Sequence, residues 1–425
     1  MRTAVTRYRA LFATPGVLRV ALPSLLGRLP IGMSTLLFVL VVYAGTGSYG
    51  AAGLATAANS ALTAVTAPAL GRLADRGRAV AVLVSTGLAQ AALLVALVLA
   101  LRSDPGLPLV VALAGLAGAV NPPIGAVTRV VLPRLAPDPQ AVQTAFALDA
   151  ISVELTYVLG PTVVGVVAAV LDPDAAALLA AAITAAGAVA LATAPAVRSA
   201  YAVPRPAVPT PRGRRHRGGR RRGPLRTRGM IVVLAVAGLE AAAYGVLEVA
   251  IPAHAGHLGQ PDSAGVLVAV WSAGSIIGGL WYSGQTFRIP PNRQYAILMC
   301  ANLLGFGSLL LATGLPSLGV LLFLAGLVIS PTTAVEYALV TALAPKGAET
   351  EAFTWAGTAV YLGFAAGSAL AGSVLSSTLA TARGLTVSTV VATALVLVGA
   401  ALTVAYRRRL ATDCSVSQVG SIRSR

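Results

Sequence analysis

The chain has 425 residues, of which 56% are apolar and only 11% are charged, and its mean hydropathy is +0.81. An ordinary globular domain has about 25% charged residues, so this composition excludes a water-soluble fold. The formal net charge of +17 raises the question of nucleic acid. We expect no nucleic-acid partner, because aromatic residues for base stacking do not alternate with the arginines.

Apolar runs that end at charged residues, proline or glycine predict six membrane-spanning helices in each half of the chain. The first six lie near 17–43, 50–70, 79–101, 107–131, 142–170 and 174–196. The second six lie near 229–252, 263–285, 294–314, 317–342, 350–377 and 385–406. The first run is longer than the core of a signal peptide and lacks a clear cleavage site, so it is taken as a retained helix.

These helices predict an all-α integral membrane protein with twelve transmembrane helices in two six-helix, pseudo-symmetric bundles. The bundles are expected at 1–196 and 229–406, with a basic linker at 197–228 and a tail at 407–425. Related glycines occur at one offset in the two halves. Transporters are often built from such repeats, with the substrate site between them.

Basic residues are distributed unevenly among the predicted loops. If both termini are cytoplasmic, only Arg102 and Arg383 of the 31 basic residues lie outside. Apart from Arg19 and Arg28 within the first predicted helix, the others fall in the N-terminal segment, the linker, the tail or the loops predicted at 71–78, 129–139, 286–293 and 343–351. Since cytoplasmic loops are enriched in Lys and Arg, we expect a multi-pass protein of the inner (cytoplasmic) membrane with both termini in the cytoplasm.

The linker at 197–228 is rich in Pro, Gly and Arg and is predicted to be a solvated, disordered tether. Two interpretations of its charge are open. It either attracts anionic lipid headgroups, at about 1 kcal/mol per basic residue, or serves only as an orientation signal.

The loop between the second and third predicted helices reads Gly71-Arg72-Leu73-Ala74-Asp75-Arg76-Gly77-Arg78. It resembles the signature of the major facilitator superfamily, which also has six plus six helices around a long central cytoplasmic loop. Members usually have one more residue before the second glycine and a basic residue where Ala79 stands here. The resemblance implies a latch formed by Gly71, Asp75, Arg76 and Arg78 that closes the cytoplasmic side in the outward-facing state. The alternative is that these arginines only orient the loop.

A second motif lies in the fifth predicted helix, where Gly160-Pro161 is followed by Gly165. Proline removes a backbone hydrogen bond and kinks a helix, while glycine lets a neighbouring helix approach closely. The motif is similar to one that exporters of this family carry in the same helix, although Thr156 and Val164 stand where glycine is preferred. It favours export over uptake.

Ionisable side chains at membrane depth are costly and are therefore functional candidates. The six candidates are Arg28, Asp149, Glu154, Glu240, Glu248 and Glu336. At a rise of about 1.5 Å per residue, Arg28 and Glu154 lie at similar depth and are expected to pair, with Asp149 as the alternative partner. Such a pair either holds the two helices together or takes part in switching.

No basic residue lies at the depth of Glu240 in its own half, so this carboxyl is the first candidate for loading and releasing a proton. Glu248, two turns further along, is either a proton relay or a water-exposed carboxyl near His254 and His257. Glu336 lies near the inner end of its helix, where its side chain can reach water.

Polar and aromatic positions within the spans suggest a mostly apolar substrate cavity. The candidates for its lining are Asn59, Tyr157, Tyr244, Trp271, Asn302, Trp355 and Tyr361. The chain has three histidines and neither a His-Glu-x-x-His pattern nor a phosphate-binding Gly-x-x-x-x-Gly-Lys loop, so we expect no enzyme, no metal and no cofactor.

The resemblance therefore predicts a secondary transporter that exports a small hydrophobic or amphipathic compound in exchange for protons by alternating access, as a monomer. Two alternatives stay open, an uptake carrier for a small metabolite and a non-transporting membrane sensor. Abundant Arg, Ala, Val and Gly are compatible with a bacterial origin.

Overall fold

A computed structural model describes residues 2–103, 106–202, 224–258, 260, 263–376 and 384–422. Within these ranges the regular structure is entirely helical. Most of the predicted linker, 203–223, lies outside the described residues, as do Arg383 and the last three residues of the predicted tail. The proposed lipid contact of the linker therefore stays a prediction.

The first bundle contains the six predicted spans. They are α2 (Val17–Thr46), α3 (Tyr49–Leu73), α4 (Ala79–Leu101), α5 with α6 (Leu107–Ala119 and Ile124–Leu135), α7 (Pro139–Val170) and α8 (Pro173–Thr193). The second bundle follows the same plan. Its spans are α10 (Arg228–His257), α11 (Ser263–Ser283), α12 (Pro291–Ser308), α13 with α14 (Leu315–Gly326 and Ile329–Leu343), α15 (Glu349–Ser376) and α16 (Gly384–Ile422).

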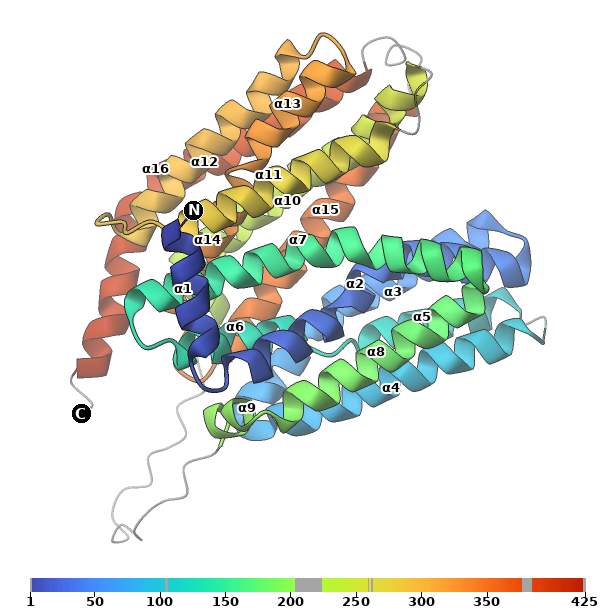
Figure 1. Cartoon of the computed structure of the whole chain (residues 1–425), viewed down its shortest axis with the longest axis horizontal. Helices are drawn as coiled ribbons and strands as arrows, with labels where there is room; N and C mark the ends of the chain where they lie inside the picture. The colour runs from blue at the N-terminus through green and yellow to red at the C-terminus, as the bar shows by residue number, and fades with distance from the viewer. Residues whose placement is uncertain are drawn as a thin grey trace, which may run out of the picture.

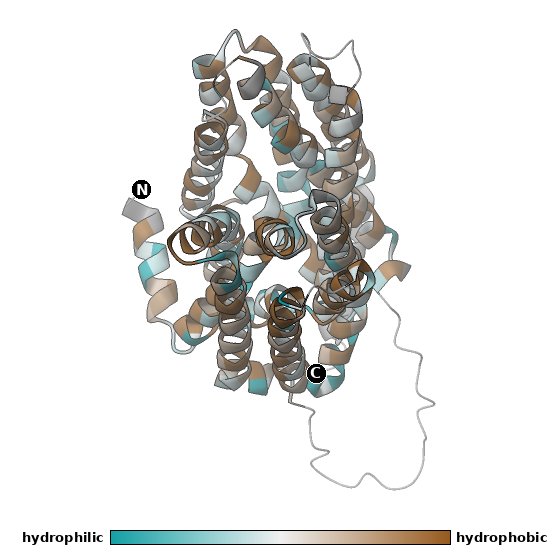
Figure 2. Cartoon of the chain, turned by 90° about the vertical axis from the view of Figure 1, so that its right-hand side faces the viewer, coloured by the Kyte–Doolittle hydropathy of each residue, from teal (hydrophilic) through white to brown (hydrophobic). Residues whose placement is uncertain are grey.

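Ten described segments are long and apolar enough to cross a membrane. One of them, Gly50–Leu101, contains both α3 and α4, which a tight turn at Arg76 and Gly77 separates. With α15 added, the twelve predicted spans are confirmed. Brown, hydrophobic residues predominate along the helices of both bundles, as a chain that spans a membrane requires (Figure 2).

The fourth span of each half is divided into two helices, a feature that the sequence analysis does not predict. The break between α5 and α6 falls at Asn121-Pro122-Pro123, and the one between α13 and α14 falls just before Ser330-Pro331. Proline lacks the N–H that would continue the helical ladder, so both spans are interrupted near these prolines.

Three further differences concern the ends of the two bundles. An additional helix, α1 (Arg2–Ala13), precedes the first span, and a short one, α9 (Pro195–Ala200), follows α8. The last span continues as a helix to Ile422 instead of ending where the tail is predicted to begin.

The guanidinium of Arg7 on α1 donates to the backbone oxygens of Ser283 and Gln285, 2.7 Å away in each case, at the carboxyl end of α11. A cation suits this position because the last carbonyls of a helix carry partial negative charge.

The two bundles meet at one end of the molecule and diverge toward the other (Figure 1). We call the end that carries Ala202 and Pro224, the residues flanking the linker, the linker end, and the opposite one the far end. Helices α3, α6 and α7 of the first bundle pack against α11, α14 and α15 of the second. The interface between these helices holds several of the residues that the sequence analysis singles out.

Candidate functional site

The carboxylate of Asp75 binds the start of α15 across the interface between the bundles. It accepts hydrogen bonds from the backbone N–H groups of Thr350, at 3.1 Å, and Glu351, at 2.8 Å. The first N–H groups of a helix lack partners within it and carry partial positive charge, so the carboxylate caps α15 from the other bundle. Burial raises the pKa of the Asp75 carboxyl above its ordinary value, and these hydrogen bonds oppose the shift.

The remaining latch residues differ in what they contact. A Cβ atom at Gly71 would lie 2.5 Å from Thr354 Oγ1, so glycine permits the close approach of α3 to α15. Arg76 and Arg78 are exposed and form no ion pair within the described part of the chain. A role of Arg76 and Arg78 in the latch therefore stays a prediction. The ion pair is made by Arg72, whose Nη2 lies 2.7 Å from Glu351 Oε1.

Further hydrogen bonds join the bundles at the linker end. Tyr201 shares one with Thr350, and Arg134 lies 3.6 Å from Glu349. Gln143 on α7 donates to the backbone oxygen of Tyr282 at 2.8 Å. Thr358 on α15 donates to the backbone oxygen of Ala64 at 3.0 Å. Together with Asp75, these contacts close the linker end.

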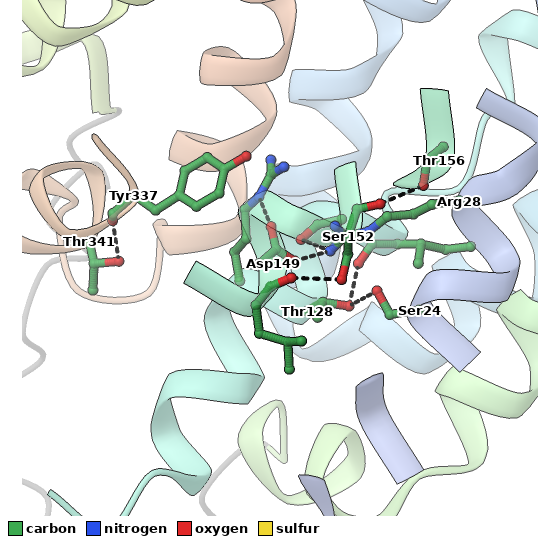
Figure 3. A network of polar contacts seen from close by, with 12 residues as sticks. Ser24, Arg28, Thr128, Asp149, Ser152, Thr156, Tyr337 and Thr341 are labelled. Carbon is green, nitrogen blue, oxygen red and sulfur yellow. Dashed lines mark hydrogen bonds and ion pairs between the residues drawn. The ribbon is translucent and has the colours of Figure 1, made fainter. Parts of the chain in front are cut away.

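Arg28 forms a buried ion pair with Asp149, as Figure 3 shows. Both side chains are less than 5% exposed. The expected pairing of Arg28 with Glu154 is wrong, and the alternative partner is the one that the structure contains. The depth estimate was too coarse to separate two acidic residues little more than one helical turn apart on α7. Ser24 and Thr128, which share a 2.8 Å hydrogen bond, border the pair.

The same carboxylate binds a second arginine that the sequence analysis missed. Arg129 Nε lies 2.8 Å from Asp149 Oδ2, and its guanidinium carbon lies 4.1 Å from the centroid of the Tyr337 ring in the second bundle. Arg129 was assigned to a loop at 129–139, but it occupies the middle of α6. The signal available in the sequence was its position inside the apolar run predicted to end at residue 131.

Glu154 crosses from α7 to the second bundle. Its Oε1 accepts a hydrogen bond of 3.0 Å from Ser275 Oγ on α11, and Ser275 is in turn 2.8 Å from Ser330 Oγ on α14. The carboxyl thus contacts hydroxyl groups and forms no ion pair with a described residue.

Glu240 lies within the second bundle and is 5% exposed. Its Oε1 accepts hydrogen bonds from Tyr244 Oη and Asn302 Nδ2, each at 2.6 Å. Asn302 Nδ2 also lies 3.2 Å from Thr332 Oγ1 on α14. Among the described residues Glu240 has no cationic partner, as the sequence analysis expected.

The two remaining carboxyls differ in exposure. Glu336 was expected to reach water, but it is 5% exposed, because α14 packs with α10, α12 and α7 around it. Glu248 is exposed on α10, and its charge acts on Tyr157 of the first bundle. Its expected proximity to His254 and His257 stays a prediction.

Four of the seven expected lining residues lie at or beside the interface. Tyr157 is 50% exposed and interacts electrostatically with Tyr361 of the other bundle. Tyr244 and Trp271 form an aromatic cluster with Phe306, which the sequence analysis missed; the Tyr244 ring centroid lies 5.7 Å from each of the other two.

The other three expected lining residues have packing roles. Asn59 donates to the backbone oxygen of Ala114, 3.0 Å away inside the first bundle. Asn302 is fully buried beside Glu240, and Trp355 packs partly buried against the core of the second bundle.

Gly160 and Gly165 on α7 have different surroundings. A Cβ atom at Gly160 would lie 2.5 Å from the carbonyl carbon of Gly32, whereas one at Gly165 would meet nothing within 4 Å. We therefore expect Gly160→Ala to destabilise the fold by about 1–3 kcal/mol, because the backbone of α2 has to move. Gly165→Ala is the matched control and should leave stability unchanged or slightly raised. Thermal unfolding in detergent micelles measures both, and equal melting temperatures would contradict the close contact.

The chain forms two six-helix bundles that are in contact at one end, with buried carboxyls between and within them. This arrangement is that of a multi-pass membrane transporter of the alternating-access type. The sequence profile described as Major Facilitator Superfamily matches residues 25–368. The chain belongs to this family.

Comparison with solved structures agrees on the fold. A bacterial homologue of the iron transporter ferroportin in the outward-facing state has a TM-score of 0.71 at 14% identity, over 92% of this chain and 99% of the other. The human organic anion transporter TETRAN has a TM-score of 0.64 at 16% identity, over 92% and 99%. The curated proteins contain no match to the sequence.

Proposed function

We propose that the protein exports a small hydrophobic or amphipathic compound from the cytoplasm in exchange for protons. The linker end is taken as cytoplasmic because nearly all basic residues of the loops lie there. With the linker end closed and the far end diverging, the molecule is then in its outward-facing state (Figure 1). The observation that carries the proposal is Glu240, a carboxyl that is 5% exposed and has hydrogen-bond donors but no cation beside it.

Such a carboxyl suits a proton site because its charge is costly inside an apolar bundle, while neutralisation by a proton removes that cost. Tyr244 links it to the interface. The Tyr244 hydroxyl binds Glu240, and its ring lies in the aromatic cluster with Trp271 and Phe306. A flat apolar compound bound against these rings would sit next to the proton site, which is the arrangement that exchange requires.

The export direction is supported by the glycine at position 160, where α7 and α2 come into backbone contact. Pro161 lies within the continuous helix α7. The orientation and the inner-membrane location are part of this proposal.

The test is accumulation of a panel of lipophilic dyes and drugs in inverted membrane vesicles that carry a proton gradient. We expect accumulation by the native chain that collapses when the gradient is removed, and its loss in Glu240→Gln. Asp174→Asn is the control, because Asp174 lies in an exposed pair with Arg102 at the far end. Accumulation by Glu240→Gln equal to the native chain would exclude Glu240 as the coupling residue. No accumulation of any compound would contradict export and favour an uptake carrier or a sensor.

A further inference from the structure

Three charged side chains of the first bundle form a cluster whose net positive charge faces the second bundle. Arg28 and Arg129 both bind the single carboxylate of Asp149. The guanidinium of Arg129 is the one at the interface, since it stacks on the ring of Tyr337. When all three are ionised, their net charge is +1.

Two buried acidic groups of the second bundle, Glu240 and Glu336, lie across the interface from this charge. Glu336 is the residue directly before Tyr337 on α14, and the charge of Arg129 acts on it. The charge of Glu240 acts on Glu336 as well. Both carboxyls are 5% exposed, and Glu336 accepts no hydrogen bond from any described residue. Two ionised carboxylates so placed repel each other, so the positive charge of Arg129 balances only one.

Near Glu240 and Glu336, two buried polar atoms have no hydrogen-bond partner among the described residues, so the site can accommodate a further proton. Asn302 binds Glu240 through Nδ2, yet its Oδ1 is fully buried and has no hydrogen-bond donor among the described residues. The hydroxyl of Tyr295, on the same face of α12, is buried and also without a described partner. These polar atoms point to an incompletely satisfied site rather than to a packed core.

The other ionisable groups near Glu336 are few. Tyr244, Tyr295 and Tyr337 interact electrostatically with it. Tyrosines stay neutral in the physiological range. On the other elements packed against α14, α7 contributes Asp149, Glu154 and Tyr157, α15 contributes Glu349, Glu351 and Tyr361, and α11 contributes Tyr282. Helices α10 and α12 add Arg228, Glu248, His254, His257, Arg293 and Cys300, whereas α13 and the 384–405 part of α16 contribute none. Among the described cations of the first bundle, Arg129 is the one whose charge acts on Glu336, and its distance from Glu336 changes when the bundles move apart.

We propose that Glu240 and Glu336 form one proton-binding carboxyl pair, which shares a single negative charge while Arg129 lies beside it, and that binding of one further proton favours parting of the bundles at the linker end. A proton from the water at the open far end converts the remaining carboxylate to the neutral acid, which no longer needs the positive charge of Arg129 beside it, so the bundles can part. Arg129 keeps its charge and its bond to Asp149. This assignment rests on the proposed proton exchange and names the pair and the interface charge that carry it.

The pair predicts that acid favours opening of the linker end. If opening of the linker end is accompanied by binding of one proton, the ratio of open to closed molecules rises about tenfold for each unit by which the pH falls. This dependence holds at pH values between the pKa of the pair in the closed state and its pKa in the open state. The ratio can be measured on the purified full chain, without substrate or gradient, from spin-label distances between cysteines at positions 78 and 346. These positions are exposed on opposite bundles at the linker end, and the native Cys300 and Cys414 are replaced by serine.

Variants assign the titration to individual residues. Glu336→Gln should make the ratio independent of pH, because Glu240 alone does not face Arg129. Glu240→Gln should keep a dependence that moves to lower pH, because a single carboxylate beside Arg129 is no longer repelled by a second. Arg129→Gln should abolish the dependence and favour the open state. The control Asp174→Asn should behave as the native chain.

A native pH dependence in Glu336→Gln would overturn the proposal, as would a native chain whose ratio does not respond to pH. Sodium chloride in place of potassium chloride tests for a metal ion, and a shift of the ratio by sodium at constant pH would also overturn it. Loss of vesicle accumulation with the tenfold pH dependence intact would contradict export and still support the pair, so the two proposals fail separately.

Discussion

Asp149→Asn is expected to lower the free energy of unfolding by roughly 3–5 kcal/mol, the usual cost of leaving buried charges without their partner. The substitution leaves the guanidinium groups of Arg28 and Arg129 close together with no carboxylate between them. Two further nitrogens of Arg28, Nε and Nη1, have no partner among the described residues, so few other contacts replace the lost one. Denaturation of the purified protein in detergent measures the loss.

The double variant Arg28→Gln/Asp149→Asn separates charge from packing. It removes one of the two opposed cations, so its loss should be smaller than the sum of the two single losses. Asp174→Asn breaks the exposed pair with Arg102 and should cost about 0–1 kcal/mol. A loss in Asp149→Asn no larger than that in Asp174→Asn would contradict the structural role of the ion cluster.

Asp75→Ala should shift the molecule toward the state in which the linker end is open. The change removes the acceptor for two N–H groups at the start of α15. Loss of a helix cap costs about 1–2 kcal/mol, which corresponds to a roughly 5- to 30-fold change in the ratio of open to closed molecules. Because these contacts join the two bundles, the cost falls on the closed state.

The readout is the rate at which a thiol reagent labels Thr358→Cys, since Thr358 is buried in the linker-end interface beside Ala64. Labelling should be faster in Asp75→Ala by the same factor. Arg78→Ala is the matched control, because Arg78 belongs to the same loop but is exposed. Equal labelling rates in the two variants would show that Asp75 does not hold the linker end closed.

The number of spans could be predicted because each span leaves its own apolar run in the sequence, independent of its neighbours. The division of the fourth span in each half was missed, although Pro122, Pro123 and Pro331 were visible. Proline is tolerated within membrane helices, as Pro161 in the continuous helix α7 illustrates. Whether a proline breaks a helix therefore depends on its neighbours.

Contacts between distant residues were harder to predict than the helices. Depth along a helix placed Arg28 near both Asp149 and Glu154, but only the rotation of α7 decides which carboxyl faces it. Arg129 was assigned to a loop because its charge suggested water, whereas Asp149 and Tyr337 compensate that charge inside the protein. The same reasoning predicted that the Glu336 side chain reaches water. Its burial could not be predicted, because a single sequence does not show which helices pack around α14.

The central claim is that the two bundles alternate between closure at the linker end and closure at the far end. It is tested most directly by two spin-label distances in the cysteine-free background, one between positions 78 and 346 and one between the exposed far-end positions 103 and 313. Alternating access predicts two populations in which a short linker-end distance occurs with a long far-end distance, and the reverse. Asp75→Ala should move both distributions in opposite directions. Distances that change at one end only, or lengthen together at both ends, would contradict the account.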